Sequence, residues 1–370
     1  MSKKFAVGIC GSVTNPSKKY NPLIYCRSNE GKSLLWTLAH KPKNKTFINK
    51  ELLKGLLLIE AVRIENGKCY INFPYFLKKD KKIIENVTKK YAIKLAEKIK
   101  QKKGRFSKLS KSVQYNKVSA DKVLFIAVGC ACLDWRGLSL FAEQDYLLEG
   151  PAKPGGNNYT LWGQEEIKGS LKELYWGSHN EECGKYTLTS FGDHETKKRD
   201  CFPDIFWNMV WDRNKFKESR FEDELYASFK DSLGTWGERI ASELLDFKPS
   251  KETGVTKLLK KLFYIKNNKI NIPILVKKDA PVIKEIKACM DELILDWAYD
   301  NYDDLRTELS AISPSRNGVD YRDTFLQIWH YVFGYTNKYL AREGIIFNPY
   351  AAGSDFKGYL PAVHENRLNL

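Results

Sequence analysis

The sequence predicts an α+β protein in which helices predominate, and three observations support that class. Long segments place apolar residues at the spacing of an amphipathic helix; in the segment 77–103 these residues are Ile84, Val87, Tyr91, Leu95 and Ile99. Two short segments are arranged around Asn-Gly or Asn-Asn, and such pairs are typical of tight hairpin turns. A repeated sequence joins a helix to each of these two hairpins.

The repeat is clearest at residues 70–80 and 269–279. Both stretches contain the pattern I-N-x-P, then three residues, then K-K-D. Leucine-rich helices precede them, at Leu52 to Leu56 in the first copy and at Leu258 to Leu262 in the second. Each copy therefore predicts a helix, a strand, a tight turn and a second strand. The proline ends that second strand because it has no amide hydrogen to donate.

The composition indicates a folded protein without a membrane span. Of the 370 residues 43% are hydrophobic, and the longest apolar run, Val123 to Leu133, is too short to cross a bilayer. The apolar N-terminus is broken by Gly8 and Gly11, which favours a short strand over a secretion signal. The eight cysteines include no C-x-x-C pair, which fits reduced thiols. We therefore expect a cytoplasmic protein.

Positive charge is concentrated in the first third of the chain. Residues 1–120 hold 28 Lys and Arg against 7 Asp and Glu, whereas the remaining residues hold 33 against 38. A surface with this excess attracts a polyanion, because binding releases the counterions condensed on the phosphates. Solvated lysine-rich helices are the alternative, but lysines that serve only solubility would be spread over the whole chain. The charge distribution therefore predicts a nucleic-acid partner.

The basic third also contains a recognisable order of elements. Helices are predicted at Ser33 to Lys41 and at Lys50 to Leu57, with a short basic connection at 42–46 and the first hairpin immediately after. Over about residues 20–76 this order resembles the winged helix-turn-helix of bacterial transcription regulators of the ArsR or MarR sort. The fold implied is an N-terminal winged helix and a second winged-helix-like unit flanking a Trp-rich central region.

This resemblance implies how the N-terminal unit binds double-stranded DNA. The helix before the hairpin would enter the major groove, and the hairpin would contact the backbone. Lysines supply phosphate contacts, whereas arginine and short polar side chains are better suited to reading base edges. The candidate DNA-binding residues are Lys41, Lys43, Asn44, Lys45, Thr46, Asn49, Lys50, Lys54, Arg63 and Lys68.

The sequence suggests three consecutive domains. Residues 1–110 would form the basic DNA-binding domain with its long amphipathic helix, residues 111–220 a central ligand-sensing region, and residues 221–370 a second winged-helix-like and helical domain. Outside the repeats, further helices and one hairpin (171–176 with 185–191) are expected. The helices are at 122–143, 203–211, 221–229, 236–247, 281–298 and 321–342.

The central region has two candidate sites, and ordinary core packing is the third interpretation of the same residues. Aromatic side chains with a few polar groups favour a small-molecule site, and the candidates for it are Trp135, Trp162, Trp176, His179 and His194. A tetrahedral zinc site is the other possibility, although the spacing matches no standard signature. Its ligands would be His179, Cys183, His194 and Cys201.

Together these patterns predict a DNA-binding transcription regulator that responds to a small molecule and forms a homodimer on a palindromic operator. The main alternative is a metal-dependent nucleic-acid-processing or defence enzyme; an RNA-binding module is a third. The segment Cys26 to Ser33 ends in G-K-S but lacks the first glycine of a phosphate-binding loop. No G-x-S-x-G or H-E-x-x-H motif occurs, so the sequence offers no positive case for catalysis.

Overall fold

The computed structural model describes residues 5–15, 17–113, 118–148, 152–165, 176–193, 201–203 and 233–368. Helices predominate over several small sheets, which confirms the predicted α+β class. The chain forms two compact units that interleave in sequence, not the three consecutive stretches expected. Unit 1 comprises 1–92, 138–172 and 297–332, and unit 2 comprises 93–137, 173–296 and 333–370. Sequence boundaries do not mark the units because long helices pass from one to the other.

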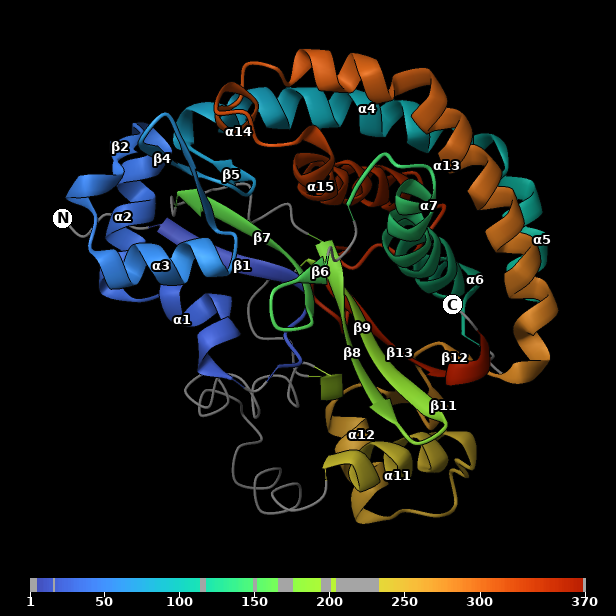
Figure 1. Cartoon of the computed structure of the whole chain (residues 1–370). Helices are drawn as coiled ribbons and strands as arrows, with labels where there is room; N and C mark the ends of the chain where they lie inside the picture. Colours follow the sequence, from blue (N-terminus) through green and yellow to red (C-terminus); the bar gives the residue numbers. More distant parts are fainter. Residues whose placement is uncertain are drawn as a thin grey trace. The chain divides into compact units, whose positions relative to one another are not determined.

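The sheet of unit 1 joins strands that are far apart in the chain. β1 (Phe5–Ser12) pairs antiparallel with β7 (Asn157–Glu165), and β7 pairs parallel with β5 (Tyr75–Phe76) (Figure 1). The short β6 (Ala152–Lys153) pairs with the start of β7. Gly11 has a φ of 101°, and a Cβ there would lie 2.4 Å from the backbone oxygen of Asn158, so the close approach of β1 and β7 requires glycine.

Small elements next to this sheet form the N-terminal part of unit 1. In chain order they are η1 (Lys18–Tyr20), α1 (Pro22–Cys26), α2 (Asn29–His40), β2 (Lys43–Asn44), η2 (Lys45–Phe47), α3 (Lys50–Leu58), β3 (Val62–Glu65) and β4 (Lys68–Ile71). The strands form a three-stranded sheet in the order β2-β4-β3. Asn66 and Gly67 turn the hairpin with φ angles of 48° and 74°, as the Asn-Gly pair predicts.

Longer helices make up most of the rest of the described chain. They are α4 (Lys81–Gln101), α5 (Lys103–Lys111), α6 (Ala120–Leu124), the π-helix η4 (Phe125–Arg136), α7 (Gly137–Glu143), α13 (Ala280–Glu308), the short α14 (Ser313–Arg316) and α15 (Tyr321–Arg342). Residues 120–143 form one continuous helix. Of the described helices it alone is long and apolar enough to cross a membrane, but 78% of its most apolar window is buried, consistent with a core helix of a soluble protein.

Aromatic side chains from three helices form the core of unit 1. The ring of Phe141 packs edge-on against Trp329 at 4.6 Å and against Phe325 at 5.2 Å between centroids, and Trp297 packs on Trp329 at 5.4 Å. All four side chains are fully buried. Burial of such large rings contributes strongly to stability, because apolar area and edge-to-face contact both favour the folded state.

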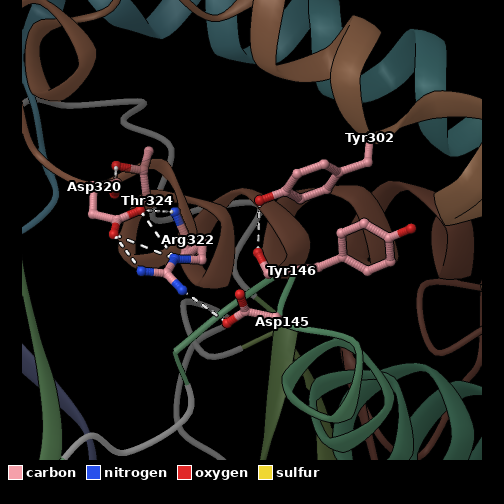
Figure 2. A network of polar contacts seen from close by, with 6 residues as sticks. All are labelled: Asp145, Tyr146, Tyr302, Asp320, Arg322 and Thr324. Atoms are coloured by element: carbon pink, nitrogen blue, oxygen red, sulfur yellow. Dashed lines mark hydrogen bonds and ion pairs between the residues drawn. The ribbon is translucent and has the colours of Figure 1, made fainter.

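Polar contacts hold the same three helices at the edge of that core (Figure 2). The guanidinium of Arg322 donates to Asp320 at 2.9 Å and to Asp145 at 2.8 Å. The second contact links the start of α15 to the segment two residues beyond the end of α7. The hydroxyl of Tyr302 on α13 donates to the backbone oxygen of Tyr146 at 2.7 Å. The two carboxylates raise the pKa of Arg322 above its already high usual value, so the guanidinium stays charged in these ion pairs.

Unit 2 contains a second mixed sheet and a second helix-and-hairpin segment (Figure 1). The sheet order is β12-β13-β9-β8, formed by β12 (Ile274–Leu275), β13 (Tyr359–Glu365), β9 (Tyr186–Asp193) and β8 (Trp176–Cys183). The segment comprises α11 (Leu233–Leu245), α12 (Gly254–Lys261), β10 (Ile265–Lys266) and β11 (Lys269–Ile270). The final turn is η7 (Asn366–Leu368). Of the expected elements, the helix at 221–229 lies outside the described residues, and so does the helix at 203–211 except for its first residue.

The repeated Asn has the same role in both copies. Its side-chain amide donates to the backbone oxygen of the residue two positions beyond the preceding helix: Asn72 to Glu60 at 3.2 Å and Asn271 to Phe263 at 2.9 Å. Both acceptor residues have a positive φ, 56° and 60°. The amide therefore fastens the end of the hairpin to a strained helix terminus in each copy.

These contacts correct one alignment made from the sequence. The amide of Ala61 donates to Leu56, and the equivalent amide of Tyr264 donates to Leu259, both at 2.9 Å. Leu56 therefore corresponds to Leu259, whereas matching the leucine runs pairs it with Leu262. The run-based alignment was wrong because the first hairpin is longer than the second, and leucines in adjacent helical turns resemble one another in sequence.

The repeated K-K-D sequence caps the following helix in each copy. η3 (Lys78–Asp80) precedes α4, and η6 (Lys277–Asp279) precedes α13. The Asp80 carboxylate accepts from the amide of Leu77 at 2.8 Å, and that of Asp279 accepts from Val276 at 3.0 Å. Each aspartate is almost completely buried. Buried amides near a helix start need such an acceptor, which explains why the aspartate recurs.

We expect replacement of Asp80 by alanine to lower the free energy of unfolding by about 2–3 kcal/mol. The second oxygen of Asp80 also accepts from the amide of Ser313 at 3.1 Å, so two buried donors would lose their acceptor. Asp80→Asn keeps one acceptor oxygen and should lose less than Asp80→Ala. Urea denaturation measures the stability of the wild type and of the two variants. Equal midpoints for all three would contradict the capping role.

Candidate nucleic-acid interface

The helix expected to contact DNA is α3, and its start is well defined. The side chain of Asn49 caps it by accepting from the amides of Glu51 at 3.0 Å and Leu52 at 3.2 Å. Lys50 and Lys54 are exposed and lie one turn apart, so they share a face. On the inner side, a Cβ added at Gly55 would lie 2.2 Å from the ring of Tyr25, so α1 packs closely on α3.

The hairpin and the strand before α3 place further lysines beside one another. Asn44 pairs with Lys68 across β2 and β4, and the amide of Lys45 donates to the oxygen of Gly67 at the hairpin turn at 3.0 Å. Lys45 and Lys68 are exposed, and Lys43 is half-buried. We call Lys43, Lys45, Lys50, Lys54 and Lys68 the basic surface. Their positive charges come from four elements, β2, η2, α3 and β4, and lysines so placed can contact phosphates along a duplex.

A groove lies between α2, η2 and α3, with a volume of about 430 Å³. Phe47 and Ile48 both line it; Phe47 has 73% of its area exposed, whereas Ile48 is buried. The sequence analysis missed Phe47 because an aromatic residue beside a buried isoleucine is usually a core residue. The groove is lined by Asn29, Glu30, Ser33, Leu34, Thr37, Lys43, Phe47, Ile48, Asn49 and Leu52.

The remaining candidates in this unit differ in how they are held. The side chain of Arg63 is held by three hydrogen bonds. Its guanidinium donates to Glu65 at 2.6 Å, to the backbone oxygen of Ile71 at 2.8 Å and to the backbone oxygen of Asn317. It therefore holds the hairpin in place, and we assign it no base contact. Thr46 donates to the side chain of Asn44 at 2.8 Å, and both residues are exposed next to the basic surface. Lys41 is exposed directly after α2.

The aromatic residues expected to form a ligand site are divided between the two units. Trp162 lies on β7 of unit 1, whereas Trp135, Trp176 and His179 belong to unit 2; His194 lies outside the described residues. Trp176 is completely buried, and its ring packs 5.9 Å from those of Phe125 and Phe191. This environment is that of a core tryptophan.

Two of the residues expected to bind zinc, His179 and Cys183, lie on one strand, whereas His194 lies outside the described residues. His179 and Cys183 lie four residues apart on the extended strand β8, about 13 Å along the strand, which is too long for two ligands of one zinc ion. Burial raises the pKa of Cys183 to about 12, so its thiol stays protonated. Among the described residues, no group of three or more His, Cys, Asp or Glu is placed to hold a metal ion.

One buried carboxyl group in unit 2 was missed by the sequence analysis. Asp134 lies in the π-helix η4, and burial raises its pKa to about 7, against the opposing effect of hydrogen bonds from Ser178. The Ser178 hydroxyl also accepts from the Trp135 indole at 2.7 Å. The position of Asp134 in the middle of an apolar helix is the one sequence signal for a buried carboxyl group, since an aspartate there is rarely buried without a partner.

Comparison with known proteins finds no match to this chain among family models, curated proteins or solved structures.

Proposed function

We propose that the protein is a DNA-binding transcription regulator that contacts the backbone of duplex DNA through the basic surface of unit 1. The observation that supports this proposal is the concentration of five lysines on β2, η2, α3 and the hairpin, where two hydrogen-bonded strands meet the start of a capped helix. In winged-helix proteins a helix and an adjacent hairpin contact a duplex in this way. We place the activity in the cytoplasm, because the cysteines are scattered along the sequence without a C-x-x-C pair, a pattern that fits reduced thiols.

The groove beside α3 supports sequence reading as well as backbone contact. Asn49 and Phe47 lie next to the lysines, so a polar and an apolar side chain would face the bases if the lysines engage phosphates. The side-chain oxygen of Asn49 caps α3, so its side-chain amide is the group that would donate to a base edge, and an aromatic ring contacts the thymine methyl group. We assign to Lys43, Lys45, Lys50, Lys54 and Lys68 the phosphate contacts, and to Phe47 and Asn49 the contacts with base edges.

Salt titration of duplex binding tests this function. Five lysine–phosphate contacts predict that the logarithm of the affinity falls against the logarithm of salt with a slope of about −4.5. Fluorescence anisotropy with a labelled duplex gives this slope, and single-stranded RNA of the same length is the matched control. Tighter binding to RNA, or an affinity independent of salt, would contradict the proposal. Cleavage of the duplex on addition of Mg²⁺ or Mn²⁺ would support the metal-dependent enzyme instead.

A further inference from the structure

The repeat extends well beyond the segments found in the sequence. In unit 1 the amide of Lys78 donates to Glu165 at the end of β7, and in unit 2 the amide of Lys277 donates to Glu365 at the end of β13. Gly163 donates to the oxygen of Pro74 at 2.8 Å, and Val363 donates to that of Pro273 at 3.0 Å. The short strand after each hairpin therefore joins a later strand through equivalent contacts.

The paired strands show the same correspondence. β7 lies antiparallel to β1 and parallel to β5, and β13 lies antiparallel to β9 and parallel to β12. A glycine with positive φ faces a tyrosine in both sheets: Gly11 opposite Tyr159, and Gly192 opposite Tyr359. Such agreement of topology, register and backbone conformation indicates duplication of a complete structural unit.

The helix before β7 and the helix before β13 end in the same way. The amide of Tyr146 donates to Phe141 at 2.8 Å, and that of Ile345 donates to Leu340 at 2.9 Å. The residue just before each donor, Asp145 in the first helix and Gly344 in the second, has a positive φ angle, 57° and 62° respectively. This is the left-handed residue that closes a helix C-terminus. Thus residues 120–143 correspond to α15, and the first copy runs from β1 to β7.

The two copies exchange helical segments. Residues 93–137 belong to the first copy but pack in unit 2, whereas residues 297–332 belong to the second copy but pack in unit 1. Reciprocal exchange of equivalent segments is typical of a domain-swapped homodimer. Here both copies are covalently joined, so one chain already contains both halves of such a dimer.

The second copy also has a basic helix and hairpin. Lys257 and Lys261 are exposed one turn apart on α12. The correspondence of Leu56 with Leu259 makes Lys257 the counterpart of Lys54, whereas Lys261 takes the place of Leu58. Lys269 is exposed on the hairpin next to the Asn-Asn turn. Two other lysines here are neutralised, Lys260 by Glu252 and Lys266 by Asp355, each at 2.7 Å. The second surface is therefore less positive than the first, while it keeps the same arrangement of elements.

We infer, on the basis of the proposed function, that the second copy is a second DNA-reading surface and that one chain recognises an asymmetric duplex site with two different half-sites. The half-sites differ because the two reading helices differ. α3 begins at Asn49 beside the exposed Phe47, whereas α12 is capped by Thr253, whose hydroxyl accepts from the amide of Thr256 at 3.1 Å. Covalent linkage replaces dimerisation, because binding of one copy raises the effective concentration of the other.

Selection of binding sites from randomised duplex DNA tests this inference with the full-length protein. The expected result is two conserved sequence blocks that differ from each other within one selected duplex. Native mass spectrometry of the selected duplex should show one chain on each duplex. In the variant with Lys257→Glu, Lys261→Glu and Lys269→Glu, one block should disappear, and affinity for the selected duplex should fall on the order of 10²-fold.

The matched control is Lys103→Glu, Lys108→Glu and Lys111→Glu on α5, which changes the net charge equally and should keep both blocks. A palindromic site that binds two chains would overturn the inference, and so would a single block that the α12 and hairpin substitutions leave unchanged. Absence of any duplex binding by the wild-type protein would overturn the proposed function itself, and the selection distinguishes that failure because no sequence is then enriched.

Discussion

Replacing Lys43, Lys45, Lys50 and Lys54 together by glutamate is expected to lower the affinity for duplex DNA by at least about 10³-fold. Each substitution removes a phosphate contact and adds repulsion by a negative charge. None of the four side chains belongs to the buried core, so the fold should be retained. Fluorescence anisotropy measures the affinity, and the circular dichroism spectrum together with the melting temperature verifies folding.

A second charge-reversed variant separates local contact from overall charge. Lys103, Arg105, Lys108 and Lys111 are exposed on α5, and their replacement by glutamate changes the net charge of the chain by the same amount. Their loss should weaken binding much less, because attraction without direct contact is screened by salt. Equal loss in both variants would mean that the basic surface makes no specific contact.

Asp134→Asn is expected to stabilise the protein by about 4 kcal/mol at pH 8 and to have little effect at pH 4. Burial raises the pKa of Asp134 to about 7, above the value of about 3.9 for an unfolded aspartate. Between these values the folded state binds more protons than the unfolded state, so the contribution of this group to stability falls as pH rises. Above pH 7 the folded protein carries a buried charge that asparagine does not have.

Urea denaturation of both proteins across that pH range measures this effect. The free energies of unfolding should agree near pH 4 and then diverge up to about pH 7. Asp323→Asn provides a comparison, because burial raises the pKa of Asp323 to about 6. The free energy of unfolding of this variant should therefore stop diverging from that of the wild type at a lower pH. If the free energies of unfolding of Asp134→Asn and the wild type differ by the same amount at every pH, the raised pKa of Asp134 is contradicted.

Local chemistry made several elements of unit 1 predictable. Helix α2 and helix α3 follow from leucines at helical spacing and from the side chains of Ser28 and Asn49, which cap their first turns. The hairpin follows from Asn66 and Gly67, which tolerate positive φ. These signals lie within a few residues of the structure that they determine, so a single sequence is sufficient to show them.

The roles of individual side chains depended on residues far away in the chain. Arg63 was expected at DNA, but its guanidinium is held by Ile71 and by Asn317, from the end of α14. Asp134 was not singled out, since its pKa depends on burial and on contact with Ser178 of another segment. In both cases the environment, and hence the charge available for function, is created by long-range packing.

The amino-acid sequence alone determined the α+β class, the basic first third, the capped helices and the existence of two related segments, because charge, periodicity and turn chemistry are local properties. Only the tertiary structure decided the full extent of the duplication and the exchange of helices between two interleaved units. Strand pairing and helix packing join residues separated by more than a hundred positions. Such contacts are selected by the combined free energy of burial and hydrogen bonding over the whole chain, which no short segment specifies.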